Sequence, residues 1–222
     1  YKELQNEKQI RLSLFKITHE IKNPIAVCKG YLDMLNTNNQ KQVEKYIPII
    51  KSEIERLLSI LQDFLLINKT NLDLDIMDFN LLIEDTINKL NPLLKENNIK
   101  LKLNIIDDEV FINGDYNRLS QVLVNIIKNS IEAMSCVDNK KIKITTSIKN
   151  NNYNLIVEDN GIGINKNILK KIKEPFFTTK NRGSGLGVAL IYEIIEAHSG
   201  SVNYTSEEGK GTKVTVKIPL YE

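Results

Sequence analysis

The N-terminal part of the chain carries apolar residues at the spacing of two long helices. In residues 4–36 they alternate in steps of four and three, at Ile10, Leu14, Ile17, Ile21, Pro24, Cys28, Tyr31 and Leu35. A second series follows a polar break at residues 37–39, at Val43, Ile47, Ile50, Ile54, Leu57, Leu61 and Phe64. This heptad spacing is typical of helices packed in a bundle. The short break between them predicts an antiparallel hairpin.

A single hairpin would leave much of its apolar surface in contact with water. Leu58 and Leu65 widen the apolar stripe of the second helix. Two hairpins that form a four-helix bundle would bury this surface, which predicts a homodimer. The alternative is that the hairpin packs on the domain that follows it in the chain.

Beyond residue 71 the pattern changes to a mixture of strands and helices. Period-two alternation and short apolar runs predict strands at residues 74–77, 99–103, 110–112, 142–148, 154–158, 202–205 and 212–218. Helical periodicity covers residues 81–94, 115–134 and 188–198, with a shorter helical stretch at 166–172. We therefore expect an α+β fold in two domains, a helical hairpin at residues 1–71 and a layer of helices on a mainly antiparallel sheet at 72–222. The polar segment 68–71 is the expected hinge between them.

The composition limits the classes of partner. The 222 residues are 41% hydrophobic and 26% charged, with a net charge of +2. Such a charge favours neither a nucleic acid nor an anionic membrane as the principal partner. Cys28 and Cys136 show no metal-binding spacing. Because no run of about 18 apolar residues is present, we expect this segment to be cytoplasmic, with any membrane anchor in a region that precedes Tyr1.

His19 occupies the heptad position farthest from the apolar seam, so its imidazole should point away from the hairpin core. Glu20 adjoins it, and Asn23 lies one helical turn further on the same face. An isolated surface histidine usually has no role beyond solvation. A neutral imidazole is, however, a competent nucleophile at neutral pH, and an adjacent carboxylate can orient it.

Polar residues run along one face of the predicted helix 115–134, at Gln121, Asn125, Asn129 and Glu132. Any amphipathic helix has such a face, so a solvated surface is one interpretation. The other is ligation through amide oxygens, because Mg²⁺ prefers hard oxygen donors and adds few protein ligands to those of a phosphate.

Two glycine-containing segments are candidates for ligand binding. Asp159–Gly163 follows a predicted strand, where a carboxylate can accept a hydrogen bond from a base amine and glycines permit positive φ. Gly183–Gly187 opens a predicted helix, whose N-terminus favours phosphate. The connection between them is long and contains Pro175–Lys180 and Arg182, which suggests a lid. Its phenylalanines could anchor it, or could be ordinary core residues.

Taken in order, these motifs resemble the catalytic core of the sensor histidine kinases of bacterial two-component systems. Residues 15–24 match the family's phospho-acceptor box, 125–129 its Asn box, 159–163 and 183–187 its Gly boxes, and 175–180 its Phe box. The resemblance implies a dimeric phosphotransfer hairpin and an ATP-binding α/β sandwich similar to those of type II topoisomerases and heat-shock chaperone ATPases. Residues 128–134 also resemble a subgroup related to nitrogen-regulatory and sporulation kinases.

The resemblance also implies roles for single residues. His19 would be the phospho-acceptor and Glu20 its general base or orienting group, while Asn23 matches a position that helps place water for dephosphorylation of the partner. Asn129 would bind Mg²⁺ and Asp159 would read the adenine amine. The remaining nucleotide-binding residues would be Asn125, Gly161, Gly163, Phe177, Lys180, Arg182, Gly183, Gly185, Leu186 and Gly187. Glu132 departs from the Lys or Arg of many members, which gives Lys180 or Arg182 a larger share of the phosphate contacts.

The implied activity is ATP- and Mg²⁺-dependent autophosphorylation of His19, followed by phosphoryl transfer to an aspartate in the receiver domain of a response regulator. Two alternatives stay open: a nucleotide-binding scaffold that does not turn nucleotide over, and a dimer in which phosphatase activity dominates. A related ATPase module that uses nucleotide for conformational clamping is a further possibility, against which the exposed position of His19 argues.

Overall fold

The computed structural model describes residues 2–68, 72–180 and 183–221, and the side chains of 17–65 and of the last two ranges. By internal contacts the chain divides into two compact units. The first contains residues 1–69 and 175–186, and the second contains residues 70–174 and 187–222. The predicted hinge and domain boundary fall largely at residues outside the described ranges, so both stay predictions.

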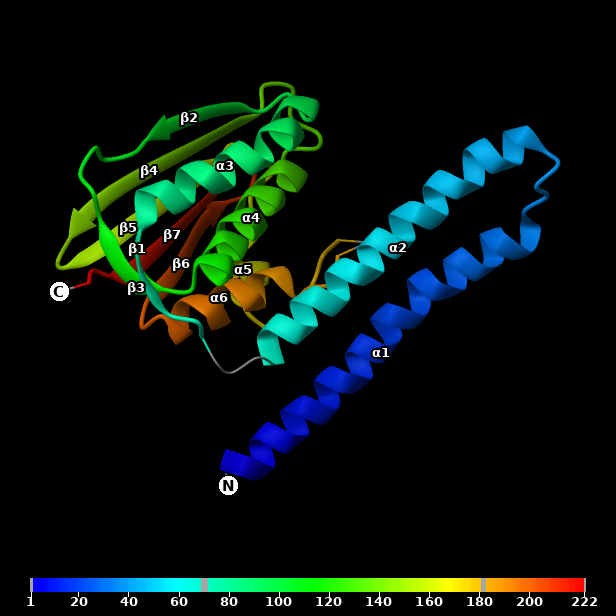
Figure 1. Cartoon of the computed structure of the whole chain (residues 1–222), viewed down its shortest axis with the longest axis horizontal. Helices are drawn as coiled ribbons and strands as arrows, with labels where there is room; N and C mark the ends of the chain where they lie inside the picture. The colour runs from blue at the N-terminus through cyan, green and yellow to red at the C-terminus, as the bar shows by residue number, and fades with distance from the viewer. Residues whose placement is uncertain (1, 69–71, 181–182, 222) are drawn as a thin grey trace. The chain divides into compact units, whose positions relative to one another are not determined.

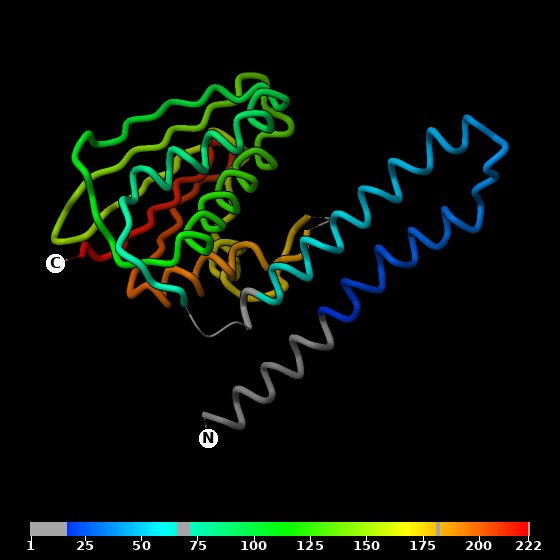
Figure 2. Tube along the Cα trace, in the orientation of Figure 1, coloured from blue at the N-terminus to red at the C-terminus, as the bar shows by residue number. Residues whose placement is uncertain are grey.

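The N-terminal unit is built on the predicted antiparallel hairpin. Helix α1 (Lys2–Met34) and helix α2 (Gln40–Asn68) run side by side (Figures 1 and 2). Tyr31 and Tyr46 pack between them with ring centroids 5.1 Å apart. The thiol of Cys28 lies 3.7 Å from the carbonyl oxygen of Ile50. The free Cys28 is therefore a seam residue, as its heptad position indicates.

From residue 17 onward the seam of α1 follows the heptad prediction, whereas part of the predicted seam of α2 is exposed in the single chain. The side chains of the predicted seam residues Ile10 and Leu14 lie outside the described ones. On α1, Ile17 is buried while His19 and Asn23 are exposed. On α2, the predicted heptad residues Ile47 and Ile54 are 45% and 48% exposed in the single chain, so α1 does not cover them. The apolar stripe of α2 is too wide for one neighbouring helix to cover, because Leu58 and Leu65 extend it.

The second unit contains a five-stranded sheet in the order β2-β4-β5-β7-β6. Its strands are β2 (Lys100–Asn104), β4 (Lys141–Lys149), β5 (Asn152–Asp159), β6 (Ser201–Glu207) and β7 (Gly211–Pro219). All neighbouring strands are antiparallel except β2 and β4, which are parallel. The predicted, mainly antiparallel sheet is therefore confirmed.

Three long helices lie on one face of this sheet (Figure 1): α3 (Phe79–Glu96), α4 (Tyr116–Ala133) and α6 (Gly187–Ala197). The short helix α5 (Lys166–Leu169) is the helical part of the predicted stretch 166–172. Alternate residues of the strands meet the apolar stripes of the helices and form the core. Its fully buried members include Leu82, Ile83, Leu119, Leu123, Ile126, Ile127, Ile142, Ile144, Tyr153 and Leu155.

A separate two-stranded sheet leads the chain into this layer. Strand β1 (Asp75–Asp78) pairs antiparallel with β3 (Phe111–Gly114), which ends directly before α4. Asp115 caps α4, since its side chain accepts a hydrogen bond from the backbone N–H of Arg118. Among the described residues, no helix is both long enough and apolar enough to cross a lipid bilayer.

Candidate functional site

The first group of predicted site residues lies on the hairpin. His19 is exposed and Glu20 is half-buried. The guanidinium of Arg56, on α2, lies 3.7 Å from Oε2 of Glu20 and 3.5 Å from Oε2 of Glu53. Arg56 thus holds the carboxylate of Glu20, the residue that follows His19 in the chain, toward α2. Because both side chains of the Arg56–Glu20 pair remain partly solvated, the pair orients Glu20 more than it stabilises the hairpin.

Asp159 stands at the end of β5 and accepts hydrogen bonds on both carboxylate oxygens. Its Oδ1 accepts from the backbone N–H groups of Gly161, at 2.9 Å, and Thr212, at 3.2 Å. Its Oδ2 accepts from the hydroxyl of Ser130, at 2.9 Å. Burial raises the pKa of Asp159, while these hydrogen bonds lower it in part. These hydrogen bonds fix the orientation of the carboxylate, so it can accept a hydrogen bond from a nucleotide base.

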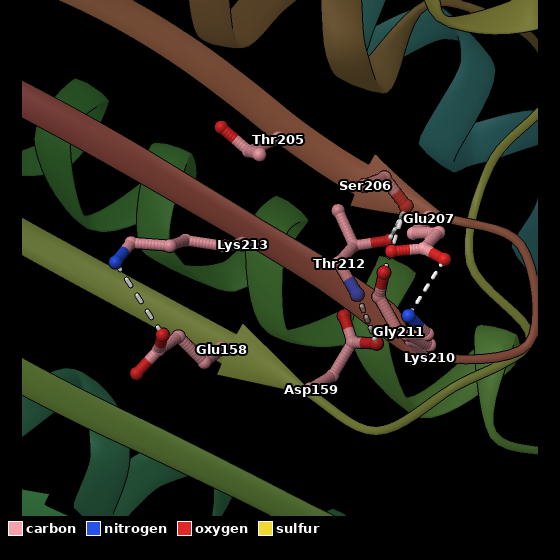
Figure 3. A pocket seen from close by; sticks show the side chains of 9 residues that line it. All are labelled: Glu158, Asp159, Thr205, Ser206, Glu207, Lys210, Gly211, Thr212 and Lys213. Carbon is pink, nitrogen blue, oxygen red and sulfur yellow. Dashed lines mark hydrogen bonds and ion pairs between the residues drawn. The ribbon is translucent and has the colours of Figure 1, made fainter. Parts of the chain in front are cut away.

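Asp159 also lines a hollow of about 270 Å³ at this end of the sheet (Figure 3). Figure 3 shows its carboxylate beside Thr212 on β7, with the ion pair of Lys213 and Glu158 further along the strands. The hollow is lined by Glu158, Asp159, Thr205, Ser206, Glu207, Lys210, Gly211, Thr212 and Lys213. It is open and polar, and Asp159 is the only predicted site residue among those that line it.

Asn125 lies on α4, and its side-chain amide nitrogen donates no hydrogen bond to any described residue. Its Oδ1 accepts from Nε2 of Gln121 at 3.3 Å, but its buried Nδ2 has no partner among the described residues. A Cβ added to Gly187, the first residue of α6, would lie 3.9 Å from Cγ of Asn125. A buried amide donor and a helix N-terminus therefore lie together, which suits an anion. Asn129, one turn further along α4, is half-buried.

The glycines of the first segment make close contact with the protein's own backbone. Gly163 has φ of 72°, and a Cβ there would lie 2.1 Å from the carbonyl oxygen of Glu207. At Gly161 a Cβ would lie 2.8 Å from the carbonyl oxygen of Ala133. The positive φ predicted for this segment is confirmed at Gly163. The close approach serves the packing of the segment on α4 and on the turn between β6 and β7.

A backbone hydrogen bond joins the segment 175–180, which contains two phenylalanines, to the second glycine-containing segment, 183–187. The backbone N–H of Phe176 donates to the carbonyl oxygen of Gly185 at 2.9 Å. Gly185 has φ of 66°, and a Cβ there would lie 2.5 Å from the carbonyl carbon of Phe176. Phe177 is half-buried, Lys180 is exposed and Leu186 is buried. Arg182 lies outside the described residues.

Comparison with known proteins identifies the family. A family model described as "His Kinase A (phospho-acceptor) domain" matches residues 14–71, and one described as "Histidine kinase-, DNA gyrase B-, and HSP90-like ATPase" matches residues 114–222. The solved catalytic domain of histidine kinase ThkA is 30% identical, with a TM-score of 0.60, and the match covers 66% of this chain and 95% of that one. This chain belongs to the histidine kinase family.

Longer relatives of this histidine kinase core match both units. Sporulation kinase E of Bacillus subtilis is 37% identical over 206 residues, which cover 92% of this chain and 28% of that protein. ThkA in complex with the response regulator TrrA has a TM-score of 0.80 and 27% identity over 99% of this chain and 66% of that one. The chain thus spans less than a third of sporulation kinase E.

Within this family, the residues present fit a nucleotide with bound Mg²⁺. Asn125 Nδ2, which has no hydrogen-bond partner in the described part of the chain, lies beside the start of α6, where phosphate oxygens could be received. Asp159 offers acceptor oxygens for a base. The amide oxygen of Asn129 is of the type that Mg²⁺ prefers.

Three residues that contact the predicted site residues could not be identified from sequence patterns alone. Ser130 directly follows Asn129 and is buried against Asp159, but a serine in a helix carries no signal of its own. Thr212 contacts Asp159 only because β7 pairs with β5. Arg56 meets Glu20 only because α1 and α2 form a hairpin. All three contacts join residues distant in sequence.

Proposed function

We propose that this chain is the catalytic core of a sensor histidine kinase that phosphorylates its own His19 with ATP and passes the phosphoryl group to an aspartate of a response regulator. The observation that carries the proposal is an exposed His19 in the hairpin that matches a phospho-acceptor domain, followed in the chain by a carboxylate that Arg56 holds. The same chain carries an ATPase-like domain.

The nucleotide-binding residues have separate tasks in this proposal. Asp159 accepts a hydrogen bond from the adenine amine, and Asn125 donates to a phosphate. Asn129 provides an oxygen ligand for Mg²⁺. The segment with Phe177, Lys180, Arg182, Gly183, Gly185 and Leu186 forms the lid, and Gly187 opens the helix at the phosphates. Bound ATP with Mg²⁺ supplies the phosphoryl group and neutralises the charge that develops on it.

At the hairpin, a ring nitrogen lone pair of His19 would attack the γ-phosphorus of ATP. The new N–P bond forms as the bond from that phosphorus to the β,γ-bridging oxygen breaks, and ADP leaves. Glu20 orients the imidazole and accepts the proton of the other ring nitrogen, while Arg56 keeps its carboxylate in place. The protein lowers the activation free energy mainly by positioning the reacting groups, because phosphoryl transfer offers it little covalent chemistry to perform.

The proposed function requires two protein partners, a second copy of the chain and a receiver domain. The exposed apolar residues of the hairpin, among them Ile54 and Leu58, fit a second copy of the chain in a four-helix bundle. A receiver domain is the expected acceptor of the phosphoryl group, by analogy with ThkA, whose structure holds the response regulator TrrA.

Incubation with γ-labelled ATP and Mg²⁺ tests the proposal. The label on the protein should be lost in acid and retained in alkali, and it should be absent from His19→Ala. The matched control is Thr18→Ala, which alters the neighbouring exposed side chain and should retain the label. His19→Ala should still bind ATP. Tight ATP binding without label in the unaltered chain would contradict the kinase and favour the scaffold.

Asn23 favours dephosphorylation of the partner as a second activity. It is exposed one turn from His19 on the same helix face, where an amide can position a water molecule. Asn23→Ala should retain autophosphorylation and lose most of the phosphatase rate toward a phosphorylated receiver domain. Equal loss of both rates would show that Asn23 has no separate role.

A further inference from the structure

Ser130 is a buried polar residue in the nucleotide-binding unit to which the proposed function assigns no task. It lies on α4 directly after Asn129, is only 3% exposed, and donates its hydroxyl proton to Oδ2 of Asp159 at 2.9 Å. A buried hydroxyl that makes a charge-assisted hydrogen bond to a carboxylate is held in one rotamer. It also ties the orientation of that carboxylate to the helix that carries Asn125 and Asn129.

The acceptor capacity of Asp159 can be counted. An ionised carboxylate has about four lone-pair positions, two on each oxygen. The backbone N–H groups of Gly161 and Thr212 use both positions on Oδ1. Ser130 uses one position on Oδ2, so the described residues leave one acceptor position open, and it is also on Oδ2. A single N–H donor from a ligand can fill it.

We propose that Ser130 is a positioning residue that fixes Asp159 as an acceptor with one free position, and that it thereby sets the preference for a purine with an exocyclic 6-amino group. This inference rests on the proposed nucleotide binding. An amino group at position 6 donates to the free position, whereas a 6-oxo group would place two acceptors against each other. A base with no group at position 6 would leave Oδ2 without its last partner.

Loss of the Ser130 hydroxyl would weaken this selection in two ways. The carboxylate could rotate about its side-chain torsion, because Oδ2 would have no protein partner. The pKa of Asp159, which burial already raises, would rise further without one of the hydrogen bonds that lower it. Both changes weaken Asp159 as a fixed acceptor for an N–H donor on the base.

The test compares ADP with purine riboside diphosphate, which lacks the 6-amino group, so that phosphoryl transfer plays no part. The dissociation constants of both are measured for the whole chain by competition with a fluorescent nucleotide. The unaltered chain should prefer ADP by roughly 10- to 100-fold, the value of one hydrogen bond to a charged group. Ser130→Ala should reduce this preference about threefold to tenfold, with little change in the binding of purine riboside diphosphate. Ser130→Thr, which keeps the hydroxyl, should restore part of the preference.

Ser120→Ala is the matched control. Ser120 lies on the same helix and also makes a hydroxyl hydrogen bond, to Thr86 at 2.9 Å, but it has no contact with Asp159. Its replacement should leave the preference for ADP unchanged. If Ser130→Ala unfolds the chain, Ser130→Cys provides a weaker donor of similar size and should give an intermediate preference.

Other outcomes would overturn the inference. An equal loss of affinity for both nucleotides in Ser130→Ala would show that Ser130 has a purely structural role. An unchanged preference for ADP in Ser130→Ala or Ser130→Cys would show that Ser130 has no role in the choice of base. A reduced preference for ADP in Ser120→Ala would exclude an effect specific to Ser130. If the unaltered chain binds neither nucleotide, the proposed function itself fails.

Discussion

The backbone N–H of Asp115 donates to Nε2 of His198 at 2.9 Å, in the buried interior of the second unit. This bond joins the residue before α4 to the residue after α6, 83 positions apart in the sequence. Nδ1 of His198 lies 2.6 Å from the carbonyl oxygen of Ile194. Because a backbone N–H can only donate, Nε2 must carry a lone pair and the proton must be on Nδ1.

His198 should make the second unit sensitive to acid. Burial lowers the pKa of His198 below its ordinary value, Arg118 lowers it further, and Asp115 and the Ile194 carbonyl oppose this. Above about pH 7 the histidine is neutral in both the folded and unfolded states. As the pH falls through the unfolded-state pKa, the unfolded chain takes up the proton first, so stability is lost. Urea denaturation at pH 7.5 and 5.5 measures this loss.

His198→Gln should show a smaller loss of unfolding free energy on acidification than the unaltered chain. The chain has only one other histidine, the exposed His19. His19→Gln is therefore the control and should retain the full dependence on pH. If His198→Gln and the unaltered chain lose stability equally, the neutral state assigned to His198 is wrong.

Asp115→Ala should be among the most destabilising substitutions in the second unit. The Asp115 carboxylate caps α4, accepts from the backbone N–H of Asp73 at 3.1 Å and lies 3.6 Å from Nε of Arg118. Both partners of the ion pair are at least 90% buried, so the substitution removes a close carboxylate from a buried guanidinium as well as the helix cap. The total loss should be well above the roughly 1 kcal/mol of a cap alone.

Asp78→Ala is the comparison for Asp115→Ala in urea denaturation. Asp78 caps α3 by accepting from the backbone N–H of Asn80 at 2.8 Å, and it forms no ion pair with any described residue. Loss of the cap alone costs about 1 kcal/mol. Equal losses in the two variants would mean that the buried pair with Arg118 contributes nothing beyond the cap.

Gly163→Ala should destabilise the fold more than Gly209→Ala. Both glycines have positive φ, 72° and 79°, so alanine is strained at each by about 1 to 2 kcal/mol. Only at Gly163 would the new Cβ meet backbone, the carbonyl oxygen of Glu207, whereas at Gly209 it meets open space. Thermal unfolding of the two variants separates the effect of the steric clash from that of the positive φ, which both share. A similar drop in Tm for both would show that the turn between β6 and β7 moves freely.

Leu58→Ser should shift the chain from dimer to monomer in sedimentation equilibrium. Leu58 is 52% exposed on α2, within the apolar surface that the hairpin leaves uncovered. Leu81→Ser is the matched control, because Leu81 is 58% exposed on α3 of the other unit. The control should retain the association state. Dissociation by both substitutions, or by neither, would argue against a four-helix bundle built on this surface.

The order and type of the elements were readable from the sequence, because hydrophobic periodicity is a local property. The spacing of apolar residues predicted α1, α4 and α6 and the strands between them, and the structure places each close to its predicted range. The ordered motifs around His19, Asn125, Asp159 and Gly185 also identified the histidine kinase family, which the comparisons confirm. The roles given to individual site residues remain predictions.

Only the tertiary structure decided which residues hold these motifs in place. The contacts of Asp159 with Ser130 and Thr212 depend on how β5 packs on α4 and pairs with β7. The bond between Asp115 and His198 depends on the packing of α4 beside α6. The exposure of Ile54, predicted as a seam residue, depends on the geometry of one helix pair. Periodicity records which face of an element is apolar, but it does not record which distant polar group that element meets.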